Sequence, residues 1–65
     1  MKSEELKKAL LEETPVAIDG MTYAKISAII YRKRKNSIAV FAELLDRCGN
    51  SVTIVRAEDV KEVKI

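Results

Sequence analysis

The chain of 65 residues contains no histidine and no tryptophan, and it has only one cysteine, one proline and two glycines. Without histidine, a Ser-His-Asp triad and a histidine-ligated haem are excluded. The single thiol, Cys48, can form no intramolecular disulfide, and it has none of the further Cys or His ligands that a structural zinc site needs. We therefore expect no catalytic residues, no metal site and no cofactor.

Long apolar runs are missing as well. No stretch approaches the roughly 18 apolar residues that cross a membrane, and the N-terminal residues Met1 to Glu5 lack the apolar segment of a secretory signal peptide. A lone free thiol is typical of a reducing compartment. Together these features predict a cytoplasmic protein that has no membrane partner.

The residues that are present favour a folded domain. Hydrophobic residues make up 48% of the chain and charged residues 34%. A chain with this hydrophobic content is too apolar to be disordered. At this length the chain is predicted to form a single domain over residues 1–65, with only a small core. Since it has no disulfide and no metal, its stability must come from packing or from a partner that covers an apolar face.

Residues 3–13 are predicted to form an N-terminal helix. Ser3 is a suitable N-cap, and two glutamates follow it in the first turn, where the helix dipole favours acids. Leu6 and Leu10 form a narrow apolar stripe. Pro15 disfavours helical backbone at Thr14 and so ends the helix. A helix this short is marginal on its own, so it must dock on the rest of the chain or on a second copy.

After Pro15 the apolar pattern changes to an alternation with a period of two, which is typical of strands. In the long second strand, this alternation places Ala24, Ile26, Ala28 and Ile30 on the face toward the core. Five short strands are too few for a two-layer sandwich, but they can curl into a small barrel that hides its edges. The predicted fold is mainly β, a five-stranded small barrel preceded by one α-helix, with strands over 16–18, 22–32, 38–45, 51–56 and 60–65.

The order of elements over residues 15–65 resembles an SH3-like small barrel. A short first strand precedes a long second strand and two hairpins, and Arg56-Ala57-Glu58-Asp59-Val60 resembles the single helical turn before the closing strand of such barrels. The resemblance implies a binding role more often than catalysis. The chain lacks the tryptophan and the acidic-aromatic cluster of signalling SH3 domains, so polyproline binding is not implied.

Two short segments are similar to short uncharacterised proteins of Gram-positive bacteria and their mobile elements. They are Gly20-Met21-Thr22-Tyr23-Ala24-Lys25-Ile26 and Ala42-Glu43-Leu44-Leu45-Asp46. This likeness implies a bacterial origin, but it carries no activity that could be transferred to the chain.

The strongest local feature is a block of four consecutive cations, Arg32-Lys33-Arg34-Lys35, at the predicted tip of a hairpin. With Lys25 and Arg56 they could neutralise phosphates and bind nucleic acid in a salt-dependent way. The alternative is a solvated tip whose charges keep the strand ends from pairing with other chains. The net charge of only +2 favours this alternative.

A second candidate surface lies on the predicted sheet face of Tyr23 and Tyr31, or on the helix at Leu6 and Leu10. Either could bind an unidentified protein or a second copy of the chain, giving a homodimer. The alternative is that the tyrosines cover the rim of the barrel with their hydroxyls in water.

The scattered carboxylates have structural explanations, since a barrel of this size has little room for a catalytic pair. The sequence therefore predicts a non-enzymatic binding or assembly module that acts through protein–protein interaction or self-association. The alternative is a nucleic-acid-binding small barrel that uses the basic hairpin 32–35.

Overall fold

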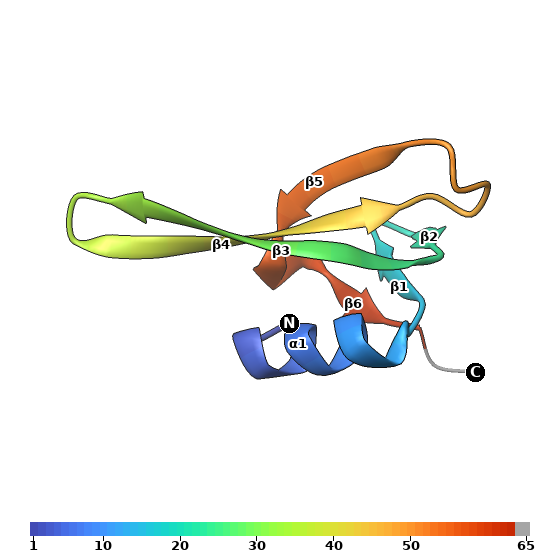
Figure 1. The fold of residues 1–65 in the computed structure, drawn as a ribbon, viewed down its shortest axis with the longest axis horizontal. Coiled ribbons are helices and arrows are strands. Elements are labelled where there is room, and N and C mark those ends of the chain that lie inside the picture. The colour runs from blue at the N-terminus through green and yellow to red at the C-terminus, as the bar shows by residue number, and fades with distance from the viewer. Residues whose placement is uncertain (64–65) are drawn as a thin grey trace.

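A computed structural model describes residues 1–63 of the chain. Within these residues, one helix precedes six strands, and a single 3-10 turn lies before the last of them (Figure 1). The elements are α1 (Ser3–Glu12), β1 (Val16–Ile18), β2 (Met21–Tyr23), β3 (Lys25–Arg34), β4 (Ser37–Leu45), β5 (Val52–Arg56), η1 (Ala57–Asp59) and β6 (Lys61–Glu62).

Helix α1 begins and ends within one residue of its predicted bounds. The prediction of Ser3 as the N-cap is wrong, because Lys2 takes that position and its backbone N–H donates to Glu5 Oε1 at 3.0 Å. The Ser3 hydroxyl instead shares a hydrogen bond of 2.8 Å with the Tyr31 hydroxyl. The helix ends at Glu12, because Glu13 adopts left-handed backbone with φ 53°.

The strands form two sheets of three. One has the order β2-β1-β6 and the other the order β3-β4-β5, with every pair antiparallel. Asp19 and Gly20 both have positive φ in the two-residue loop between β1 and β2, as a type I′ hairpin turn requires. The molecule measures 37 × 22 × 22 Å overall. The β3–β4 hairpin projects well past its other elements along the longest axis (Figure 1).

The mainly β architecture with one N-terminal helix is confirmed, but the five-stranded closed barrel is not. The predicted strand 22–32 is divided at Ala24, whose N–H donates to Leu45 O at 2.9 Å, so β2 pairs with β1 and β3 pairs with β4. Over residues 1–63 the two sheets do not close, and strand edges therefore stay open. The predicted last strand is shortened to β6, and its end at residues 64–65 lies outside the described residues.

The core lies where α1 packs against one face of the sheet β3-β4-β5. Leu6 and Ala9 of the helix are buried there, and the helix thus docks on its own chain. Removing this apolar surface from water is the main stabilising contribution in a small domain that cannot form an intramolecular disulfide. The buried residues are Leu6, Ala9, Val16, Ile26, Ala42, Leu44, Ala57 and Val60.

A β-bulge at Ser27 corrects the predicted core face of the long strand. Ser27 and Ala28 together oppose Glu43, and the Ser27 hydroxyl donates to the Glu43 carboxylate at 2.7 Å. The extra residue shifts the alternation by one. Ile26 therefore faces the core as predicted, but beyond the bulge Ile29 takes over that role. Ala28 and Ile30, predicted to face the core, point to the opposite side of the sheet.

Candidate functional site at the open edge of β4

The face of the sheet β3-β4-β5 turned away from α1 is called the outer face. Its members follow from the register, because residues directly opposite each other share a face and buried Ala42 and Leu44 mark the inner one. No element of residues 1–63 packs over this face (Figure 1). By this register the outer face consists of Lys25, Ala28, Ile30, Arg32 and Arg34 of β3, Ser37, Ala39, Phe41, Glu43 and Leu45 of β4, and Val52, Ile54 and Arg56 of β5.

Three arginines gather at one end of the outer face. Arg32 and Arg34 alternate along β3, and Arg56 arrives from the end of β5 directly opposite Phe41. The Arg32 guanidinium lies over the Phe41 ring, 5.1 Å from its centroid, in a cation–π contact. Residues far apart in the sequence thus place positive charge beside an apolar patch.

The edge of β4 next to these arginines has no strand partner. β5 pairs only with the stretch 41–45 of β4, so residues 37–40 pair with β3 alone. Two hydrogen bonds fix which backbone groups face the open side: Asp46 N–H donates toward β5 at Ser51 O, whereas Leu45 O accepts from the β3 side at Ala24. Since β4 contains no bulge, its even-numbered residues face β5 and its odd-numbered residues face β3.

It follows that Ile38 and Val40 direct their N–H and C=O groups to the open edge. The pairing of Phe41 with Arg56 lets Ala57 N–H donate to Val40 C=O, so the groups without a partner strand among residues 1–63 are the N–H and C=O of Ile38 and the N–H of Val40. The Ile38 side chain is 64% exposed, whereas Val40 packs partly against the core. Unpaired backbone groups of this kind form a template on which another extended chain can pair.

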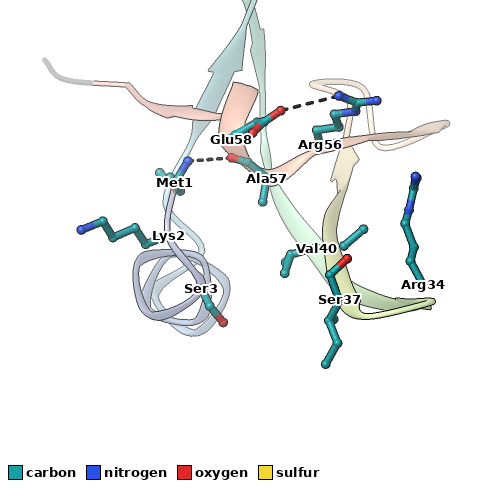
Figure 2. Close-up of a pocket in the computed structure, with 11 residues that line it drawn as sticks. Met1, Lys2, Ser3, Arg34, Ser37, Val40, Arg56, Ala57 and Glu58 are labelled. Atoms are coloured by element: carbon teal, nitrogen blue, oxygen red, sulfur yellow. Dashed lines mark hydrogen bonds and ion pairs between the residues drawn. The ribbon is translucent and has the colours of Figure 1, made fainter.

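The open edge lies in a groove of about 590 Å³. The groove runs between β4, the start of the chain and the junction of β5 with η1, and Figure 2 shows Arg34 and Arg56 on one side of β4 with the start of α1 on the other. The N-terminal amine of Met1 closes its inner end by donating to Ala57 O at 2.6 Å and to Val60 O at 3.1 Å. The groove is lined by Met1, Lys2, Ser3, Arg34, Ser37, Ile38, Ala39, Val40, Arg56, Ala57 and Glu58.

The electrostatics of the groove favour a negatively charged occupant. Glu58 is the one carboxylate of its lining, and it lies 3.7 Å from Arg56 in an ion pair whose partners are both exposed. Such a pair is weak in water. Arg34 forms no ion pair with the described part of the chain, so its charge is available to a ligand.

The structure divides the predicted nucleic-acid residues among three places. Arg32, Arg34 and Arg56 lie together on the outer face, as described above. Lys33 lies opposite Ile38 on the inner side of the hairpin, and Lys35 is in the turn. Lys25 lies at the other end of β3 and pairs with Glu13 at 3.2 Å.

The residues predicted for protein interaction lie largely in or near the core. Leu6 is fully buried, and Leu10 and Tyr23 are half-buried against the core cluster. Tyr31 is 49% exposed, and its hydroxyl is bonded to Ser3. The structure therefore does not bring these four side chains together on one free surface.

The open edge at Ile38 and Val40 is the part of the site that the sequence interpretation missed. One signal for it was available. The predicted fourth strand, 51–56, is shorter than the predicted third, 38–45, and a break at Ala57-Glu58-Asp59 follows it, so part of the longer strand had to remain unpaired.

The other polar groups show no reactive arrangement. Glu43 is bonded to Ser27, and Asp46 accepts hydrogen bonds from the Ser51 hydroxyl at 2.9 Å and from Asn50 N–H at 3.1 Å, which stabilise the β4–β5 turn. These bonds, led by that of Ser51, lower the pKa of Asp46. Cys48 is exposed in the same turn. Within residues 1–63, no three Cys, Asp or Glu side chains lie close enough to hold a metal ion.

No helix among the described residues is long and apolar enough to cross a membrane. In comparisons with known proteins, no family model matches the chain, and neither a curated protein nor a solved structure shows significant similarity to it.

Proposed function

We propose that this protein is a non-enzymatic module that binds another protein at the groove beside the open edge of β4. One observation carries the proposal. The unpaired backbone groups of Ile38 and Val40 lie in a groove bordered by Arg34 and Arg56, next to an uncovered apolar face. An open edge and an exposed apolar patch are both features through which sheet proteins bind other chains.

The apolar part of the outer face supports the same role. Val52 is 50% exposed and lies opposite the half-buried Leu45, and Ile54 is 47% exposed and lies diagonally between Leu45 and the half-buried Phe41. Single exposed apolar residues are ordinary, but here several lie together on one sheet. A partner in the groove could extend over this patch and remove it from water.

We also infer that the two sheets are an open variant of an SH3-like barrel. The order of pairing supports this, since β2 and β3 are nearly continuous and contribute to different sheets, and η1 precedes the last strand. Barrels of this kind serve mostly as binding modules. An exposed free thiol such as Cys48 is typical of proteins in a reducing compartment, so we propose that the protein is located in the cytoplasm.

Selection from a random library of eight-residue peptides tests the function directly. Peptides enriched on the wild-type protein should, when resynthesised with capped ends, shift the backbone amide NMR signals of Arg34, Arg56 and residues 37–40. A protein-binding role would be contradicted if no peptide is enriched on the protein relative to a control selection on the support alone. The Arg34→Glu variant should no longer bind the enriched peptides. The matched variant Lys33→Glu makes the same change from positive to negative charge on the inner side of the hairpin, and it should still bind them.

Nucleic-acid binding is the second candidate, and the gathering of Arg32, Arg34 and Arg56 on one face favours it. Cationic side chains beside an aromatic ring are found in single-strand binding sites. The aromatic ring here is half-buried and already covered by Arg32, which leaves little of it for a base. The chain also carries ten acidic residues against twelve basic ones, which gives a weak overall attraction for phosphates.

Fluorescence anisotropy with labelled single-stranded RNA and duplex DNA at two salt concentrations decides between the candidates. The protein-binding proposal predicts no salt-dependent binding at micromolar protein. If the protein binds nucleic acid tightly at low salt, and if changing all three arginines to glutamine abolishes this binding, the protein-binding proposal is wrong and nucleic-acid binding takes its place.

A further inference from the structure

We propose that the site recognises a phosphorylated serine or threonine side chain of the partner protein, held by the three arginines of the outer face. This inference rests on the proposed protein-binding function and specifies the chemistry of the partner. Arg34 and Arg56 line the groove, and Arg32 lies beside them on the same face. Arginine clusters are a common means of recognising phosphorylated protein segments.

The register centres the three arginines on Ala39. Arg32 lies directly opposite Ala39, and Arg34 lies diagonally from it, two positions further along β3. Arg56 lies on the diagonal toward β5, because its direct partner is Phe41, two positions along β4. Long side chains reach across such direct and diagonal positions of a sheet. The three guanidinium groups can therefore approach a single anion above Ala39 from different directions.

The space above Ala39 suits a tetrahedral anion. Ala39 and the neighbouring Ser37 are both small, so no bulky side chain fills the middle of the cluster. In Figure 2 the side chain of Arg34 extends from the hairpin toward the end of β5 that carries Arg56. The guanidinium of Arg32 is held nearby through its cation–π contact. Since a phosphate has oxygens on several sides, guanidinium groups from two strands can each donate to a different oxygen.

The net charge of the cluster matches that of a phosphate monoester. Each arginine carries one positive charge, and the exposed carboxylate of Glu58, 3.7 Å from Arg56, offsets one of the three. Arg32 and Arg34 form no ion pair within residues 1–63. A phosphoserine carries a charge of about −1.5 to −2 at neutral pH, whereas an aspartate or glutamate carries a single negative charge. A phosphorylated side chain therefore neutralises the cluster more completely than a carboxylate does.

The rest of the outer face favours a protein segment over nucleic acid. Beyond the arginines, the exposed and half-buried side chains are mainly apolar and include Phe41, Leu45, Val52 and Ile54. The next charged side chain along β4 is the carboxylate of Glu43. A nucleic acid carries a phosphate on every nucleotide, so its neighbouring phosphates would meet apolar surface and this carboxylate. A segment with one phosphorylated residue and apolar residues near it fits both parts of the face.

An NMR titration with the peptide acetyl-Val-Gly-Val-Gly-phosphoserine-Gly-Val-Gly-Val-amide tests this inference. The phosphate is its only charged group, and the valines on both sides let either chain direction contact the apolar residues of the outer face. The peptide should shift the side-chain Nε–H signals of the three arginines and bind about tenfold more tightly than the same peptide with unmodified serine. The peptide with glutamate in place of phosphoserine should have an intermediate affinity. Equal affinities of the phosphorylated and unmodified peptides would overturn the proposal.

On the protein side, Arg34→Gln and Arg56→Gln should each weaken binding of the phosphorylated peptide by about fivefold or more, because each removes one guanidinium donor. The matched variant Lys33→Gln removes a positive charge from the inner side of the hairpin and should weaken binding far less. Glu58→Gln should strengthen binding by about twofold, since it removes the carboxylate that competes for Arg56. All four side chains are exposed, and circular dichroism checks that each variant folds. Equal effects of Arg34→Gln and Lys33→Gln would contradict the proposed site.

The outcomes separate this inference from the proposed function. If library-selected peptides bind the groove but phosphorylation does not increase affinity, the protein-binding function stands and the phosphate specificity fails. If neither selected nor phosphorylated peptides bind, both fail. Inorganic phosphate that binds as tightly as the phosphorylated peptide would overturn the inference, because the arginines would then bind an anion without recognising a protein segment. Displacement of the phosphorylated peptide by single-stranded RNA at low salt, with tighter binding of the RNA, would assign the arginines to nucleic acid instead.

Discussion

Leu6 is the residue through which α1 is held against the sheets. Its side chain is fully buried, whereas Leu11 on the same helix is 83% exposed. A chain of this size has a small core, so each fully buried side chain contributes a large share of the total free energy of unfolding. Two leucines of one helix thus provide a matched pair for measuring that contribution.

Leu6→Ala should lower the free energy of unfolding by roughly 2–5 kcal/mol, because it removes buried methyl groups and leaves a cavity. Leu11→Ala should change it by less than about 0.5 kcal/mol. Urea unfolding followed by circular dichroism measures both, and a Leu6 variant that is unfolded without urea also meets the expectation. Similar effects of the two substitutions would show that the helix does not dock through Leu6.

Asp46 is the residue whose titration reports on the β4–β5 turn. The Ser51 hydroxyl is the main cause of its lowered pKa, and backbone N–H groups add to the effect. A pKa that is lower in the folded state contributes stability above the ordinary pKa of an aspartate, and this contribution is lost as the pH falls through the lowered value.

Ser51→Ala should therefore raise the pKa of Asp46 toward the ordinary value of an aspartate. The carboxyl carbon signal of Asp46, followed by NMR through the acidic range in both proteins, measures the change. The carboxyl of Glu43, which is bonded to Ser27 instead, serves as an internal control. An unchanged titration of Asp46 would mean that the hydroxyl does not stabilise the carboxylate.

At the scale of elements, the β3–β4 hairpin combines the proposed binding edge with a tip that carries several exposed cations. It projects past the core, and it exposes both the open edge of β4 and the side chain of Ile38 (Figure 1). Lysines at strand edges and hairpin tips prevent pairing between copies. Lys33 and Lys35 do not line the groove, so they are available for this protective role.

Replacing Lys33 and Lys35 with threonine should make the protein self-associate, because the hairpin then loses two charges beside an open edge and gains residues that favour strands. Sedimentation velocity at increasing protein concentration measures the effect. The wild-type protein should stay monomeric, whereas the variant should form larger species. A monomeric variant would contradict the protective role of the two lysines.

The sequence predicted most elements, because their signals are local. The helix at 3–13 follows from capping residues and proline, and strands at 16–18 and 38–45 follow from alternation and from the Asp19-Gly20 turn. The core face of β3 could not be predicted in the same way, since the bulge at Ser27 depends on which residue of β4 lies opposite it. The convergence of Arg56 with Arg34 likewise depends on the pairing of β5, which alternation does not specify.

At the scale of the whole molecule, the central feature is a sheet system that does not close. A closed barrel would satisfy its own edges, but here β5 leaves β4 early, and η1 carries the chain away to β6. Two residues of β4 consequently keep unpaired backbone groups beside two arginines. The same local geometry explains both the incomplete barrel and the proposed binding of another protein at the groove.

Amide hydrogen exchange followed by NMR tests this feature most directly. In the free protein, the N–H of Ala39 faces β3 and should be protected, whereas those of Ile38 and Val40 face the open edge and should exchange much faster. Saturation with a peptide selected from the library should slow the exchange of the Ile38 and Val40 amides and leave that of Ala39 little changed. Equal protection of all three amides in the free protein, or unchanged exchange at Ile38 and Val40 in the saturated complex, would contradict the account.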